Sequence, residues 1–170
     1  MPPIDVDGLR FRFPEGWHTG KYDEWPFYRN RWSRMWDGIK AVDIVAIGPD
    51  QTGWLIEVKD YSKHPRTKPI DLGTEIARKV FDTLAALIPA RVNAAEDAEQ
   101  RIAAAMTEAH ALRIVLHLEQ PATFSRLRPR MINPADVLQK LKQILKPIDP
   151  HTIVTDRERM GGLPWNVTRL

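Results

Sequence analysis

Residues 39–61 have the sequence IKAVDIVAIGPDQTGWLIEVKDY, in which two apolar runs flank a polar turn. The first run, 39–47, is rich in β-branched residues, and this composition predicts a strand buried on both faces. Residues 48–53, GPDQTG, have the composition of a turn, and residues 54–61 alternate as a second strand. The segment therefore predicts an antiparallel β-hairpin.

Asp43 is the unusual residue of the first run, because a buried carboxylate is costly unless it is paired or bound to a cation. In the second run Glu57 and Lys59 share one face of the strand. Directly opposed residues of an antiparallel pair point to the same side, so the turn length decides which side chain Asp43 meets. A three-residue loop at 49–51 places it opposite Glu57, and a five-residue loop at 49–53 places it opposite Lys59. An even loop sends it to the other face unless a bulge corrects the register.

Two carboxylates and an ammonium on one sheet face suit a divalent metal. Asp43 and Glu57 offer hard oxygen ligands for Mg²⁺ or Mn²⁺, and Val58 offers its backbone carbonyl. A bound metal polarises a phosphodiester oxygen and lowers the pKa of its water, while Lys59 orients or deprotonates that water and stabilises the transition state. Two other interpretations stay open: an ordinary solvent-facing pair of Glu57 and Lys59, or an Asp43 salt bridge to Lys59 or Lys40 without metal.

The rest of the chain predicts elements that flank this hairpin. The helices are expected at about 23–36, 72–87 (ended by Pro89), 95–110 and from Asn133-Pro134 onward, and further strands at 9–13, 112–118 and 151–155. The tail, 156–170, is expected to be irregular. This order predicts a single three-layer α/β (α+β) domain over 1–170, with a mixed β-sheet and helices on both faces.

The pattern Asp-x13-Glu-x-Lys across a β-hairpin, with a helix before and after it, resembles the PD-(D/E)xK nuclease superfamily and its restriction-endonuclease-like fold. The resemblance covers about residues 20–118, and 119–170 would add a helix, a strand and the tail. It implies that Asp43, Glu57 and Lys59 are the motif residues. Val42 stands where the family name has proline, and the following helix lacks the Gln-x-x-x-Tyr of one nuclease branch.

The same resemblance implies an acidic residue in the first helix near the site. Glu24 is the best match, with Asp23 and Asp37 as alternatives, although Glu24 also fits a helix-start acid favoured by the helix dipole. The aromatic residues of 25–36 are expected to pack in the core. Interleaved arginines keep base stacking open as the alternative.

Two basic loops are predicted to contact phosphate, with ordinary solvated loops as the alternative. The predicted nucleic-acid-binding residues are Lys63, His64, Arg66, Lys68, Arg126, Arg128 and Arg130. The whole chain of 170 residues carries 25 Lys plus Arg against 22 Asp plus Glu, a net charge of +3 that leans mildly towards a polyanionic partner.

The chain has no cysteine, which excludes disulfides, thiol nucleophiles and thiolate zinc sites. The sequence shows neither a signal peptide nor a run of about 18 apolar residues, so a cytoplasmic protein without a membrane partner is expected. The predicted function is a Mg²⁺-dependent endo- or exonuclease of DNA, acting as a homodimer or in a larger complex. The alternatives are a catalytically inactive nuclease-fold protein that binds nucleic acid or scaffolds a defence or repair complex, and an unrelated α/β domain.

Overall fold

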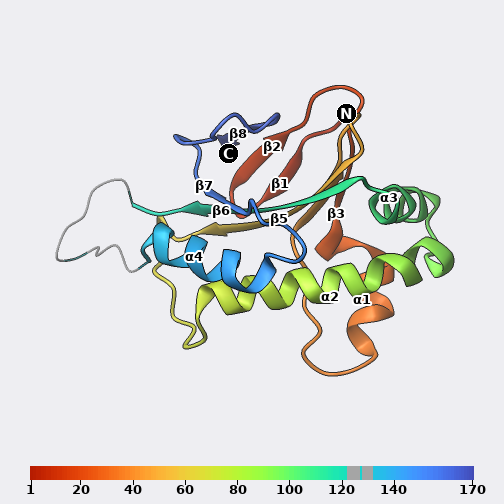
Figure 1. The fold of residues 1–170 in the computed structure, drawn as a ribbon, viewed down its shortest axis with the longest axis horizontal. Coiled ribbons are helices and arrows are strands. Elements are labelled where there is room, and N and C mark those ends of the chain that lie inside the picture. The colour runs from red at the N-terminus through yellow and green to blue at the C-terminus, as the bar shows by residue number, and fades with distance from the viewer. Residues whose placement is uncertain (122–126, 128–131) are drawn as a thin grey trace.

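The computed structural model describes residues 1–121, 127 and 132–170, and its described strands form two sheets (Figure 1). The larger sheet contains β3 (His18–Lys21), β4 (Ile44–Ile47), β5 (Thr52–Asp60), β6 (Ala111–Glu119) and β7 (Ile153–Thr155), in that order across the sheet. The smaller sheet has the order β1 (Ile4–Val6), β2 (Leu9–Arg12) and β8 (Asn166–Arg169). The helices are α1 (Pro26–Asn30), α2 (Leu72–Asn93), α3 (Asp97–Thr107) and α4 (Pro134–Leu145), with 3₁₀ turns η1 (Tyr22–Glu24) and η2 (Trp32–Arg34).

The β4–β5 hairpin has the register of the three-residue loop. Ile44 pairs with Ile56 and Ile47 with Gly53, and the Gly48 amide donates to the Thr52 carbonyl at 3.0 Å. Gln51 takes a left-handed conformation (φ 59°) at the end of the loop, a typical feature of three-residue hairpin loops. The same register, continued by one residue, places Asp43 opposite Glu57. A metal site formed by Asp43 and Glu57 requires a loop with an odd number of residues or a bulge, and the odd loop is confirmed.

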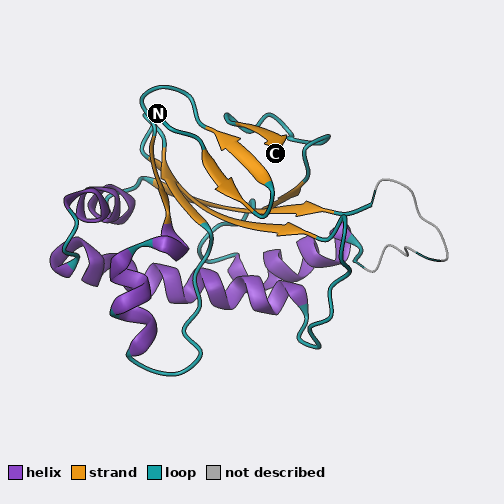
Figure 2. Ribbon diagram, turned by 180° about the vertical axis from the view of Figure 1, so that it is seen from behind, coloured by secondary structure: helices purple, strands orange, loops and turns teal. Residues whose placement is uncertain are grey.

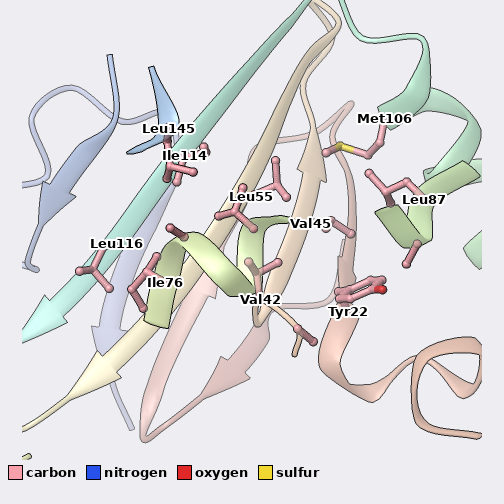
Figure 3. Close-up of a cluster of buried hydrophobic side chains, with 14 of the residues drawn as sticks. Tyr22, Val42, Val45, Leu55, Ile76, Leu87, Met106, Ile114, Leu116 and Leu145 are labelled. Carbon is pink, nitrogen blue, oxygen red and sulfur yellow. The ribbon is translucent and has the colours of Figure 1, made fainter. Parts of the chain in front are cut away.

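The larger sheet has different layers on its two faces (Figure 2). One face packs against the helices through residues such as Val45, Leu55 and Leu116, which belong to the same buried cluster as Ile76 of α2 (Figure 3). The other face, with Ile56 among its residues, packs against the smaller sheet. The mixed α/β sheet is confirmed, but the prediction of helices on both faces is wrong. The physical reason is that the N-terminal strands and the tail pair with one another and bury a second apolar layer.

The predicted helix at 23–36 is broken into η1, α1 and η2. Pro26 occupies the first turn of α1, because its ring fixes φ and it has no N–H to donate. The predicted strand at 39–47 begins only at Ile44, since the amide of Val42 donates instead to the Thr83 side chain of α2 at 3.1 Å. The segment before the hairpin is therefore attached to the helix layer.

The end of α2, the start of α4 and the structure of the tail can also be compared with the prediction. Helix α2 continues through Pro89 to Asn93, because Ala90 is fully buried and its packing outweighs the hydrogen bond that proline cannot donate. Helix α4 starts as predicted, with the Asn133 side chain accepting from the Ala135 amide at 3.1 Å. The tail, predicted to be irregular, forms β8 by pairing with β2, a contact between distant parts of the chain.

In the part of the chain that the structure describes, no helix combines the length and apolarity needed to cross a membrane.

Candidate functional site

Asp43 lies directly before β4, on the face of the larger sheet that the helices cover. Its backbone carbonyl accepts from the Tyr22 amide at 2.8 Å, and its Oδ2 accepts from the Val58 amide at 2.7 Å. The Asp43 side chain therefore extends to the edge of β5 that β4 leaves unpaired. In a strand the N–H and C=O of one residue point to the same side, so the Val58 carbonyl also faces Asp43.

Glu57 lies beside Asp43, is only 1% exposed, and its carboxylate pairs with two ammonium groups. The Nζ atoms of Lys59 and Lys79 both lie 2.5 Å from Glu57 Oε1. Glu57 Oε2 is buried, and within the described residues it has no hydrogen-bond partner. The structure thus brings the three predicted residues together and adds Lys79 from α2, which sequence reasoning missed. The only signal for Lys79 was its position beside the apolar stripe of α2, next to Val80.

The electrostatics of the cluster reflect its burial. Burial and the neighbouring Asp43 carboxylate raise the pKa of Glu57 to about 7, against the opposing effect of Lys79 and Lys59. Burial also raises the pKa of Asp43, and Lys79 is the strongest of the groups that oppose this shift. Burial lowers the pKa of Lys59, but the Glu57 carboxylate outweighs it and holds this pKa above its usual value. The cluster is a coupled set of two carboxylates and two ammonium groups.

The third carboxylate near the cluster is Asp23, not Glu24. Glu24 lies on the surface and pairs with Lys21 at 2.9 Å and Arg29 at 3.7 Å, with 48% of its side chain exposed. Asp23 Oδ1 is buried, and no described group hydrogen-bonds to it. Burial and the nearby Asp43 raise the pKa of Asp23 to about 6. The predicted role of Glu24 at the site therefore does not match its position; the alternative Asp23 does.

A pocket of about 600 Å³ opens beside this cluster. Asp23 and Asp43 line it together with four basic residues, and Lys79 connects it to the buried Glu57. The basic lining residues are Lys40, Lys68, Arg78 and Lys79. Basic and acidic side chains therefore line the same pocket.

The first predicted basic loop has a divided role. Arg66 is largely buried and donates to Glu75 Oε2 at 2.6 Å, which fastens the loop to α2. Lys68 also pairs with Glu75, at 2.9 Å, but stays 62% exposed at the pocket. Lys63 and His64 are exposed. The second predicted loop, with Arg126, Arg128 and Arg130, lies outside the described residues.

The predicted metal ligands offer free oxygen atoms to a divalent cation. Glu57 Oε2 is buried without a partner among the described groups, and Asp43 uses Oδ2 for its bond to Val58. Together with the Val58 carbonyl these are hard donors of the kind that Mg²⁺ or Mn²⁺ accepts, with water filling the remaining positions. The described residues contain no group of three or more His, Cys, Asp or Glu that could hold a metal, so two carboxylates would have to suffice.

Comparison with known proteins shows similarity to part of a cysteine–tRNA ligase. Neither a protein-family model nor a solved structure matches it. Cysteine–tRNA ligase of Neisseria meningitidis is 30% identical to the chain over 209 residues of alignment. The similarity covers 99% of this chain but 30% of the ligase, so the chain spans less than a third of the length of that relative.

This comparison overturns the prediction of a Mg²⁺-dependent nuclease. The relative is by name a ligase of tRNA, not a hydrolase of phosphodiester bonds, and DNA as a substrate has no support. The described residues likewise lack a three-ligand metal group. The physical reason for the error is that alternation along a hairpin brings such a trio together in many folds, and neither a fold nor a short pattern implies a chemistry.

Proposed function

We propose that the chain is an RNA-binding domain with tRNA as its ligand, and that it works with an aminoacyl-tRNA synthetase activity. The observation that carries the proposal is the 30% identity to cysteine–tRNA ligase along 99% of the chain. The chain corresponds to 30% of that ligase. We therefore propose that it contributes one step of aminoacylation, the binding of tRNA. Complete aminoacylation is not assigned to it.

The basic pocket supports this proposal through its charge and its size. Lys40 is exposed at the pocket, and Arg78 is 57% exposed with only a long contact of 3.9 Å to Asp82. Exposed cations at a concave surface of this kind contact phosphate groups, which supply most of the sequence-independent affinity for nucleic acids. The pocket, of about 600 Å³, has room for a phosphate and part of a nucleotide.

Aromatic side chains of α1 and of the segment that follows it supply a second kind of contact. Tyr28 lines the pocket, and its hydroxyl donates to the Ile39 carbonyl at 3.2 Å. Trp36 lies in the segment between η2 and β4, which also contains Ile39, and its side chain is 72% exposed. Unpaired bases of RNA stack on exposed aromatic rings, so Trp36 is the stacking residue that we assign. Trp25, by contrast, is buried at 6% exposure and belongs to the core.

The proposal includes a divalent cation and a finer description of the fold. Asp43 and Glu57, with the Val58 carbonyl, would hold Mg²⁺, which would supply positive charge to an RNA phosphate at the pocket. The core is proposed to be restriction-endonuclease-like in its arrangement only. The hairpin β4–β5, the helix α2 and the parallel pairing of β6 with β5 support that description.

A binding experiment tests the RNA role. Fluorescence anisotropy with labelled tRNA transcript would be measured for the wild type and for a Lys40→Gln/Arg78→Gln variant, at several salt concentrations. We expect about tenfold weaker binding and a salt slope reduced by about one to two. Lys142→Gln/Lys146→Gln removes the same charge from exposed positions in and directly after α4 and is the matched control.

The result that contradicts the proposal is equally specific. Equal loss of affinity in the pocket variant and in the α4 variant would show that the pocket has no special role. Equal affinity of the wild type for tRNA and for duplex DNA of the same length would remove tRNA as the ligand.

A further inference from the structure

Two ammonium groups meet at one oxygen of Glu57. Lys59 and Lys79 both lie 2.5 Å from Oε1, and their side chains are only 15% and 14% exposed. The other oxygen, Oε2, is buried and is not hydrogen-bonded by any group that the structure describes. Two cations on one carboxylate oxygen repel each other in a poorly solvated place, so a second cation needs a reason beyond the neutralisation of Glu57.

Lys79 differs from Lys59 in where it comes from and what else it faces. Lys59 follows Glu57 by two residues on the same face of β5, so its proximity results from strand alternation. Lys79 comes from α2, lines the pocket beside Asp43, and crosses from the helix layer to Glu57. Lys79 therefore pairs with Glu57 from a wall of the pocket that Asp43 also lines.

We propose that Lys79 is a tethered counter-ion that competes with a divalent cation for Asp43 and Glu57 and keeps the affinity of this pair for metal low. The inference rests on the metal-binding part of the proposed function and is independent of the RNA part. An ammonium held by the fold at Glu57 Oε1 places a positive charge directly beside Oε2, the oxygen that is left for a metal. A metal that binds must displace Lys79 or accept a like charge beside it.

The charge of the site supports this competition. With Asp43 and Glu57 ionised, Lys59 and Lys79 make the set neutral, whereas the removal of Lys79 leaves one uncompensated negative charge in a buried position. Because such a buried charge is costly, the carboxylate that has lost its ammonium takes up either a proton or a cation. A site that lacks Lys79 should therefore bind a divalent cation more tightly than the wild type does.

The test measures Mn²⁺ affinity by isothermal titration calorimetry, with Mn²⁺ as the probe and the full chain without RNA. We expect Lys79→Gln to bind Mn²⁺ at least tenfold more tightly than the wild type. Arg91→Gln is the matched control, because it removes one positive charge from the same helix at an exposed pair with Glu108. It should bind Mn²⁺ as the wild type does. A second substitution, Asp43→Asn in the Lys79→Gln background, should abolish the gain.

Each other result counts against the inference in its own way. Equal affinities of wild type and Lys79→Gln would overturn the competition but keep the metal site. An absence of Mn²⁺ binding in both would overturn the competition and the proposed metal site together, while tRNA affinity, measured separately, would still decide the RNA role. An equal gain in Mn²⁺ affinity in Arg91→Gln would show that the gain in Lys79→Gln results from the lower net charge of the protein and not from the position of Lys79. If Lys79→Gln folds poorly, Lys79→Met keeps the side-chain length, and the rise of its melting temperature with Mn²⁺ gives the same comparison.

Discussion

Replacement of Glu75 by glutamine should destabilise the protein in a pH-dependent manner. Glu75 is 6% exposed on α2 and accepts from Arg66 at 2.6 Å and from Lys68 at 2.9 Å. Arg66 also donates to the Ile70 carbonyl at 2.7 Å. Glu75 therefore holds the loop after β5 against the helix that carries Lys79.

The magnitude follows from the pKa of Glu75. Burial raises this pKa, but the hydrogen bonds from Lys68 and Arg66 outweigh burial and lower it from 4.5 to about 2. Each pKa unit corresponds to about 1.4 kcal/mol. Solvent screens the ion pair between Glu75 and the exposed Lys68, which reduces its contribution to the free energy of unfolding. We expect Glu75→Gln to lower the free energy of unfolding at pH 7 by about 2–3 kcal/mol. For a chain of this size the melting temperature should fall by about 4–12 °C.

The pH dependence has a definite sign. Because the folded-state pKa of Glu75 lies below its usual value, the ionised carboxylate stabilises the fold above about pH 5. This contribution is lost as the pH falls from about 5 to 2. The difference in unfolding free energy between wild type and Glu75→Gln should therefore shrink over that range.

Urea unfolding of both proteins at pH 7, 5, 4 and 3 measures this difference. Glu108→Gln is the matched control, because Glu108 pairs with Arg91 at 2.8 Å while 64% exposed. It should cost less than about 1 kcal/mol. The reasoning is refuted if the difference in unfolding free energy between wild type and Glu75→Gln stays constant from pH 7 to pH 3. It is also refuted if the loss of unfolding free energy in Glu75→Gln is no larger than the loss in Glu108→Gln.

Three further substitutions test local features by urea unfolding. Thr83→Val should cost about 1–3 kcal/mol, because the buried Val42 amide loses its acceptor at 3.1 Å; Thr83→Ser keeps the hydroxyl, and an equal cost for the two would contradict this. Asn133→Ala should cost about 1 kcal/mol through loss of the cap on the Ala135 amide, and an unchanged midpoint would show that the cap contributes little. Gln51→Gly should stabilise by roughly 0.5–1 kcal/mol, because glycine tolerates the left-handed backbone (φ 59°) without strain; a destabilised variant would contradict it.

Local signals in the sequence were sufficient for the hairpin. The turn composition of 48–53 and the alternation after Trp54 predicted two strands, and the three-residue loop was one of the registers considered for Asp43 and Glu57. The start of α4 was equally predictable, since Asn133 caps a helix by bonding to an amide two residues away. These features involve neighbours in the chain.

The helical prediction for 23–36 was wrong because the aromatic period of three to four residues continues past Arg31, whose backbone (φ −129°, ψ −66°) is not helical and ends α1. Glu24 and Asp23 are adjacent in sequence, and only the turn η1 determined which of them lies near Asp43. The role of Lys79 depends on the packing of α2 against β5, which residue spacing within α2 does not specify.

The sequence by itself therefore determined the β4–β5 hairpin and the shared face of Glu57 and Lys59, because strand alternation and turn composition act over a few residues. The register that brings Asp43 to the same face is seen only in the structure. The tertiary structure decided which side chains of other elements reach this face of the larger sheet, and which layer covers the opposite face. Lys79 arrives from the helix layer, and the tail of the chain pairs with β2 instead of staying irregular. Both depend on contacts between segments far apart in the chain, whose free energy comes from burial and packing that no local pattern records.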